Sequence, residues 1–275
     1  MNTTSIRAQF HLQTLGFLRN SRSVFFTLAF PIVLAVLFGL ADKGTDLFTD
    51  DKGTVSLSSW IAVGLSSYVM LMGGFVKVAG DIVAQRESGL LKRIRLRGTS
   101  DLSVLIGYML SGLLVSIVCL ILLLVVSVFV LHLPAPANPL GVVLVALGGV
   151  ILSTVIGVAY SSFVPSADAA QMMLLVPTLI LMFLSGVFEP SWVLPGALRN
   201  IGLVFPVQFL ADAMRSMWLG RDFVHSQVVD NGLQLGDHTG LGMLVGSGLY
   251  ICIAWLVVAA IIAIKAFRWD TRTRG

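Results

Sequence analysis

The stretch "LLVSIVCLILLLVVSVFVL", from Leu113 to Leu131, contains no charged residue and does not alternate between apolar and polar side chains. An α-helix rises about 1.5 Å per residue, so about 18 or more apolar residues cross the roughly 30 Å of hydrocarbon in a bilayer. A transmembrane β-barrel is built instead from shorter segments that alternate. The stretch therefore predicts a membrane-spanning α-helix.

The rest of the chain has the same character. Of its 275 residues, 56% are hydrophobic and 12% are charged, and the mean hydropathy is +0.93. A soluble domain carries about 25% charged residues, so this chain has too few to cover a water-facing surface. We expect an all-α polytopic membrane protein that forms a single transmembrane domain. The six predicted spans are residues 24–41, 57–78, 102–131, 140–164, 172–188 and 244–266.

The charges beside these spans predict the orientation, because lysine and arginine concentrate on the cytoplasmic side of membrane proteins. If residue 1 is cytoplasmic, both termini lie inside. The cytoplasmic side then receives all of the 18 lysines and arginines except Lys43, Lys52, Arg199, Arg215 and Arg221. The net charge of +4 thus reflects topology in the inner (plasma) membrane, and we expect no nucleic-acid partner.

Residues 1–23 precede the first span and form a longer segment than the n-region of a signal peptide, so we expect this span to remain uncleaved. Within the segment, Ile6, Phe10 and Phe17 share one helical face, and Arg7 can reach lipid headgroups. These residues predict an interfacial helix on the inner leaflet. A frayed cytoplasmic tail is the alternative.

The segment "QRESGLLKRIRLRGTS", Gln85 to Ser100, concentrates basic charge between two apolar spans. A short helix from about Ser88 to Arg97 would place Leu90, Leu91 and Ile94 on one side. The basic residues facing away from that side fit two roles, an anchor on anionic lipid or a docking surface for a soluble partner. Composition alone leaves both open.

Residues 189–243 are unusually apolar for a loop in water. Two short helices, Trp192–Leu203 and Pro206–Leu219, are predicted to dip back from the outer face, where irregular backbone is tolerated if protein surrounds it. Asp212 and Arg215 are three residues apart on the second helix and can pair. An amphipathic loop lying on the membrane surface is the alternative.

These two segments resemble ABC-2 type permeases, the membrane subunits of one class of ATP-driven exporters. The first is similar to the family's cytoplasmic loop, E-R-E-x-G-T-L-x-R, on which fall Arg86, Glu87, Gly89, Leu91 and Arg93. It departs from the family's loop at Gln85, Leu90 and Ser100. The second is similar to the family's S-G-x-x-x-P … L-P … P … D-x-x-R region, at Ser185, Gly186, Pro190, Leu194, Pro195, Pro206, Asp212 and Arg215.

The resemblance, strongest to multidrug-exporter permeases of the type V exporters, implies two sites. Residues 80–101 would form the loop that couples to the ATPase, with contacts at Arg86, Glu87, Gly89, Leu91, Lys92 and Arg93. The outer segment would form an extracellular gate from Gly186, Phe188, Glu189, Pro190, Pro206, Asp212 and Arg215.

The resemblance also implies partners. The chain has no GxxxxGK[ST] segment, the loop that cradles phosphates in P-loop ATPases, so we expect a transporter subunit and not an enzyme. We expect no cofactor on this chain: ATP and Mg²⁺ would be held by a separate ATP-binding subunit. Because six spans form half of a translocation pathway, a second copy or a paralogous permease would complete it.

Cargo is expected to be a hydrophobic or amphipathic compound, drug-like or lipid, with a polysaccharide or glycolipid as the alternative. Flexible, polarizable side chains suit a permissive apolar site. On the spans that line the cavity in related exporters, the candidates are Tyr68, Met70, Met72, Met172, Met173 and Phe183.

Two other classes of protein fit less well. A proton- or ion-coupled carrier needs ionisable groups near mid-membrane, but Lys77 and Asp81 are expected at the cytoplasmic end of a span. A membrane enzyme would need a nucleophile, paired carboxylates or an HExxH motif, and none is evident. Cys119 and Cys252 lie in apolar runs without CxxC spacing, so no metal site is predicted. All four histidines fall outside the predicted spans: His11, His132, His225 and His238.

Overall fold

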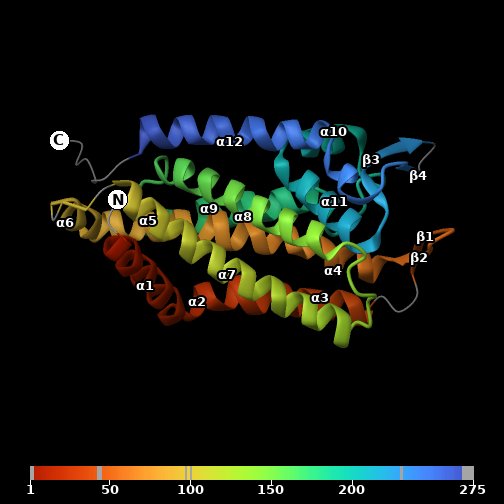
Figure 1. The fold of residues 1–275 in the computed structure, drawn as a ribbon, viewed down its shortest axis with the longest axis horizontal. Coiled ribbons are helices and arrows are strands. Elements are labelled where there is room, and N and C mark those ends of the chain that lie inside the picture. The colour runs from red at the N-terminus through yellow and green to blue at the C-terminus, as the bar shows by residue number, and fades with distance from the viewer. Residues whose placement is uncertain (1–2, 42–44, 97, 100, 230–231, 268–275) are drawn as a thin grey trace.

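The computed structural model describes residues 3–41, 45–96, 98–99, 101–229 and 232–267, which form a bundle of helices that run side by side along its long axis (Figure 1). Among these residues, five helices are long and apolar enough to cross a membrane. Four of them are α7 (Asp101–Phe129), α8 (Pro139–Ser161), α9 (Ala167–Leu184) and α12 (Ser247–Ala266). The chain is therefore an all-α, multi-pass membrane protein.

The fifth long helix is the centre of the bundle and runs without interruption from Leu57 to Glu87. Its most apolar window is 94% buried, and helices on several sides contact it. A Cβ on Gly74 would lie 2.6 Å from the Ser153 Cβ of α8, so small residues let these two helices approach closely. We call Leu57–Glu87 the central helix; it comprises α4 (Leu57–Met70), a π-helical segment (Leu71–Val76) and α5 (Lys77–Glu87).

The central helix continues beyond the span predicted for it, which ended at residue 78. Lys77 and Asp81 were expected at the end of that span, yet the helix passes both and ends at Glu87. Lys77 Nζ lies 2.8 Å from Asp81 Oδ2. Because the two opposite charges compensate each other within one helical turn, polar residues that suggested a loop are accommodated inside the bundle.

The region predicted as the first span is helical but shorter in its apolar part. It contains α2 (Ser21–Val24), a π-helical segment (Phe25–Ala29) and α3 (Phe30–Ala41). Its apolar stretch, Phe25–Leu40, falls short of the five spanning helices in length. A sixth span therefore stays a prediction.

The predicted N-terminal helix is present as α1 (Thr3–Arg19) and packs against α7. Its buried residues are Gln9, Gln13 and Phe17, whereas Ile6 and Phe10 are only half-buried. The packed face is thus rotated from the apolar face expected from the sequence. One reason is that Gln13 exchanges hydrogen bonds with Gln85 of the central helix, which lipid would not offer.

Two β-hairpins, which the sequence did not predict, lie at the end of the bundle away from α1 and α5 (Figure 1). They are β1 (Asp46–Asp50) with β2 (Gly53–Ser56), and β3 (Asp222–Val229) with β4 (Gly232–Gly236). Arg221 joins the first hairpin to the start of the second, with Nε 2.6 Å from Asp50 Oδ2 and Nη2 2.7 Å from Asp50 Oδ1. We call this end of the bundle the hairpin end.

The predicted pair of short helices between the last two spans is present as α10 (Gly196–Val204) and α11 (Pro206–Leu219). Pro206 occupies the first turn of α11, where its missing N–H leaves no hydrogen bond unmade. α11 is buried along most of its length and contacts both α4 and α8. Whether this pair re-enters the membrane remains a prediction.

Candidate functional site

The basic loop folds as α6 (Leu90–Leu96), a short helix at the opposite end from the hairpins (Figure 1). Gly89 joins it to the central helix with a φ of +69°, a conformation that favours glycine. Leu91 and Ile94 are buried and Leu90 packs beside them, so the predicted apolar side is confirmed. The outward side carries Lys92, Arg93, Arg95 and Leu96, of which Leu96 is 80% exposed. We call this end the α6 end.

Arg86 and Glu87, the last residues of the central helix, hold the turn between α8 and α9. Arg86 is buried and donates through Nη1 to the Ser161 carbonyl at 3.0 Å and through Nη2 to the Val164 carbonyl. Glu87 Oε2 accepts from the Ala167 amide at 2.7 Å. A cation thus meets the C-terminus of α8 and an anion the N-terminus of α9, which is the arrangement that helix dipoles favour. Within this chain the pair positions the turn.

Behind α6 lies a buried polar cluster that the sequence analysis missed. Gln85 exchanges hydrogen bonds with Gln13 of α1 at 2.7 and 3.2 Å, and accepts from Tyr108 Oη at 2.8 Å. Lys77 Nζ, besides its pair with Asp81, donates to Ser111 Oγ at 3.0 Å. In the sequence, the four-residue spacing of Lys77 and Asp81 could have indicated an ion pair on one face of a helix. The cluster connects α1 and α7 to α5, the half of the central helix nearer α6.

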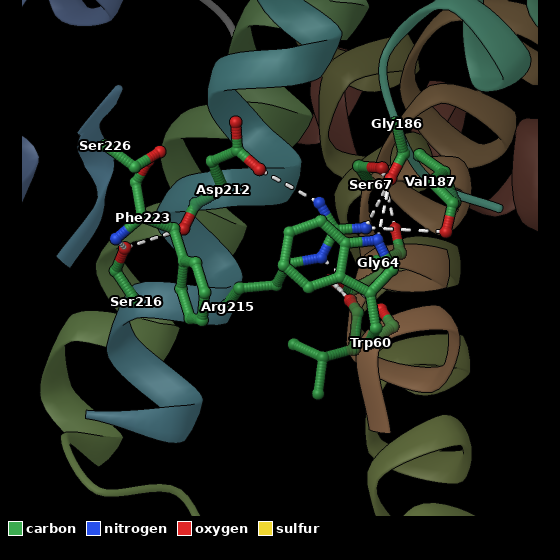
Figure 2. A network of polar contacts seen from close by, with 12 residues as sticks. Trp60, Gly64, Ser67, Gly186, Val187, Asp212, Arg215, Ser216, Phe223 and Ser226 are labelled. Carbon is green, nitrogen blue, oxygen red and sulfur yellow. Dashed lines mark hydrogen bonds and ion pairs between the residues drawn. The ribbon is translucent and has the colours of Figure 1, made fainter. Parts of the chain in front are cut away.

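At the hairpin end, Arg215 of α11 is fully buried beside the start of the central helix (Figure 2). Its guanidinium donates to the Gly186 carbonyl at 2.8 Å and the Trp60 carbonyl at 3.3 Å, and pairs with Asp212 Oδ1 at 2.9 Å. Its Cζ atom lies 3.6 Å from the centroid of the Trp60 ring, a cation–π contact. A Cβ on Gly64 would be 2.4 Å from Arg215 Nη2. The predicted Asp212–Arg215 pair is thereby confirmed.

The other residues predicted for the gate lie at different depths. Gly186 has a φ of +68° and presents its carbonyl to both Arg215 and Trp60 Nε1. Phe188 is half-buried against other aromatic rings. Pro190 is buried, whereas Glu189 is exposed. The structure therefore gathers the glycine, the aspartate and the arginine around Trp60, a residue not selected from the sequence, and leaves Glu189 outside this network.

The sequence that forms these elements matches a known family. A family model described as ABC-2 type transporter matches residues 4–219. The chain belongs to the ABC-2 type transporter family. It is therefore an ABC transporter permease, a multi-pass membrane subunit of a kind that usually works with an ABC ATP-binding subunit. No curated protein matches the chain.

The cargo candidates do not meet in one place in this ABC-2 permease. Tyr68, Met70 and Met72 are buried in the central helix, whereas Met172 and Phe183 are exposed on α9. Met173 is half-buried. Met72 alone of the six lines a cavity of about 380 Å³ between the central helix, the start of α9 and the α2 region. Its polar lining residues include Asn20, Lys77, Asp81 and Gln171, and its apolar ones Phe26, Val76, Leu174 and Leu175.

Proposed function

We propose that this ABC-2 permease is the membrane-spanning half of an exporter in the inner (plasma) membrane, with both termini cytoplasmic. A separate ATP-binding subunit, which would hold ATP and Mg²⁺, drives it through α6. A second copy or a paralogous permease completes the pathway. The observation that supports this most is the central helix, because one rigid, buried element connects the basic α6 end to the Arg215 network at the hairpin end.

The route of force follows from the contacts at each end. A partner that presses on α6 moves Glu87, and Glu87 and Arg86 carry the α8–α9 turn with them. At the other end, the same helix supplies the Trp60 carbonyl and ring that hold Arg215. Because the helix is continuous from Leu57 to Glu87, we expect it to move as a unit, so that a push at α6 shifts α11 relative to Gly186. Opening of the gate between inward-open and outward-open states is the expected result.

The cargo that best fits is amphipathic. The cavity beside the central helix is lined by both polar and apolar side chains, and its volume of about 380 Å³ lies in the range of small-molecule sites. A headgroup or cationic centre would lie against Asp81, and an apolar body against Phe26 and Leu174. This points to a lipid or a drug-like compound as substrate class.

Transport in vesicles tests the proposal. The permease is reconstituted into liposomes with the ATP-binding subunit that copurifies with it. ATP is added outside, where it reaches the molecules inserted inside-out, and accumulation of a lipophilic fluorescent cation in the liposomes is measured. We expect accumulation only with ATP and both subunits. Uphill movement by the purified permease alone would refute the need for a separate motor, and accumulation of a labelled glycolipid but not of the cation would replace the cargo class.

Orientation is tested separately. Arg93→Cys on α6 and Gln227→Cys on β3 are labelled with a membrane-impermeant maleimide in intact cells and in inside-out vesicles; both positions are exposed, whereas Cys119 and Cys252 are buried. We expect Arg93→Cys to react only in inside-out vesicles and Gln227→Cys only in intact cells. The opposite pattern would place α6 on the outer side of the membrane, where no ATP-binding subunit could reach it, and would refute the proposal.

A further inference from the structure

Three potential metal ligands meet at the base of the β3–β4 hairpin. His225 Nδ1 lies 2.9 Å from each oxygen of the Asp222 carboxylate, and His238 Nδ1 lies 3.0 Å from Asp222 Oδ2. One ligand atom from each residue lies within 4.8 Å of the other two. The family match ends at Leu219, so these residues follow the region that defines the family.

The backbone of the hairpin is shaped to bring these side chains together. Asp222 pairs with Gly236, but the next paired residues are Gln227 and Gln234, so β3 carries an irregular insertion that contains His225. Such bulges redirect side chains and are common at functional sites. A Cβ on Gly236 would lie 2.3 Å from Asp222 Oδ2, so glycine is required for the carboxylate to occupy this position.

The hydrogen bonds of His225 raise a question of charge. Its Nε2 lies 2.7 Å from the Val245 carbonyl, which only accepts, so Nε2 carries the proton. Its Nδ1 faces a carboxylate, which also only accepts. A cation is therefore needed between Nδ1 and Asp222, either a second proton on the ring or a metal ion. The His225 and His238 rings are stacked with centroids 3.9 Å apart, so both rings cannot carry a positive charge without strong repulsion.

We propose that Asp222 Oδ2 and the Nδ1 atoms of His225 and His238 bind one Zn²⁺ ion. Imidazole nitrogen and carboxylate oxygen are ligands that zinc prefers, and three protein ligands with water in the fourth position form a common zinc site. Tetrahedral ligands about 2.0–2.2 Å from zinc lie about 3.3 Å apart, so the distances of 2.9 and 3.0 Å that join the two Nδ1 atoms to Asp222 Oδ2 need to open by only a few tenths of an ångström. The Nε2–H donated to the Val245 carbonyl is the outer contact that fixes a metal-binding imidazole.

The charges and the access of the site suit a cation. The Asp222 side chain is fully buried, and the His238 side chain is 54% exposed, so an ion enters from the aqueous side past His238. Both Asp222 oxygens face His225 Nδ1 and one of them also faces His238 Nδ1, so the carboxylate is placed to share a cation with both rings.

Zinc here would brace the gate from outside. Asp222 follows α11 after only two residues, and the Val245 carbonyl that holds His225 lies just before α12. The ion would connect the end of α11 to the start of α12 through the β3–β4 hairpin. The effect belongs to the folded permease itself and does not depend on which cargo it moves or on its motor.

Direct binding measurements test the site. The full-length permease, purified in detergent with a non-histidine affinity tag and stripped with a chelator, is titrated with ZnCl₂ and then with CoCl₂. We expect one Zn²⁺ per chain by elemental analysis, and visible ligand-field bands of tetrahedral Co²⁺ that zinc abolishes. Zinc should also raise the Tm of the stripped protein.

Variants separate this site from adventitious binding. His238→Gln removes an exposed ligand without disturbing the core and should weaken zinc binding at least about tenfold. His132→Gln is the matched control, because the hydrogen bond of His132 is to the Val130 carbonyl of its own loop and His132 does not belong to the cluster; it should bind zinc like the parent protein. Equal affinity in the His225→Ala/His238→Ala double variant would overturn the proposal. So would a metal-free parent protein whose ¹⁵N spectrum shows a doubly protonated His225 and whose Tm ignores zinc.

Discussion

Each end of the central helix is held by a buried arginine that donates to backbone carbonyls, but the two ends differ in what surrounds that arginine. At the hairpin end, Arg215 is enclosed by Trp60, Gly186 and Asp212, all from this chain. At the α6 end, Arg86 is enclosed, yet the helix that follows it presents charged side chains and Leu96 to the outside. One end is completed by the permease itself, and the other offers a surface.

The difference indicates which end should tolerate change. An enclosed charge has no water to replace a lost partner, so its contacts are coupled to folding. An exposed charge contributes little to stability. A change at such a residue should therefore affect the binding of a partner more than folding. Variants at the two ends should therefore separate into those that affect folding and those that affect coupling.

The largest effect is expected for Arg215→Met. The change leaves the Asp212 carboxylate without Arg215 and removes one hydrogen-bond donor from each of the Gly186 and Trp60 carbonyls. Breaking a buried ion pair on one side typically costs about 3–5 kcal/mol. We expect a large fall in Tm. Tryptophan fluorescence in detergent measures it, with Trp60 at this site as one of the five tryptophans that contribute to the signal.

Two controls accompany that variant. Arg93→Met removes an exposed arginine at the α6 end and should leave the free energy of unfolding within about 1 kcal/mol of the parent's. Asp212→Leu combined with Arg215→Met removes both charges and should recover part of the loss. A normal Tm for Arg215→Met would mean that the hairpin end is no more enclosed than the α6 end.

A smaller effect is expected when only space is removed at the hairpin end. A Cβ at Gly64 would lie 2.4 Å from Arg215 Nη2, whereas a Cβ at Gly148 of α8 meets no atom within 4 Å. Gly64→Ala should destabilise the permease by about 1–3 kcal/mol through overpacking. Gly148→Ala should be neutral or stabilise by up to about 1 kcal/mol, because alanine is the better helix former. Thermal unfolding of the pair measures both signs, and equal behaviour would contradict the tight fit around Arg215.

At the α6 end, Glu87→Ala should affect coupling more than folding. It removes the side-chain acceptor of the Ala167 amide, and losing such a cap costs about 1 kcal/mol. We expect normal amounts of protein in the membrane and ATP hydrolysis that no longer drives transport. Glu87→Gln keeps an acceptor oxygen without the charge. Transport by Glu87→Gln would assign the role to the cap, and its loss would assign it to charge presented to the motor; normal transport in Glu87→Ala would refute a coupling role.

Much of this comparison was accessible from the sequence. Apolar length located the long helices, since a membrane span needs a run that few other structures use. The spacing of Leu91 and Ile94 predicted the inner side of α6, and the three-residue spacing of Asp212 and Arg215 predicted their pair. Each of these depends on neighbours within one helix.

What the sequence did not reveal depends on residues far apart in the chain. Trp60 joins Arg215 across 155 positions, and no local pattern relates the two. Arg86 carries the charge typical of an exposed basic loop, but its long side chain turns inward because the carbonyls at the end of α8 lack donors. The cluster of Asp222, His225 and His238 was missed because His238 meets Asp222 only after β4 folds back on β3.

The smallest expected effect is a local dependence on pH at the hairpin end. The hydrogen bond from Arg221, helped by its positive charge, lowers the pKa of Asp50 despite some opposing effect of burial. A carboxylate with a lowered pKa stabilises the folded state fully above the ordinary aspartate pKa of about 3.9. That contribution is lost as the pH falls through the lowered value, because the proton displaces Arg221. The protection of the β1 and β2 amides against hydrogen exchange, relative to the unfolded chain at the same pH, should therefore fall below about pH 4, while protection in α6, which lacks this pair, should not share the transition. In Asp50→Asn the hairpin should already exchange faster at neutral pH and show no such step; a step that persists there would assign the transition to another group.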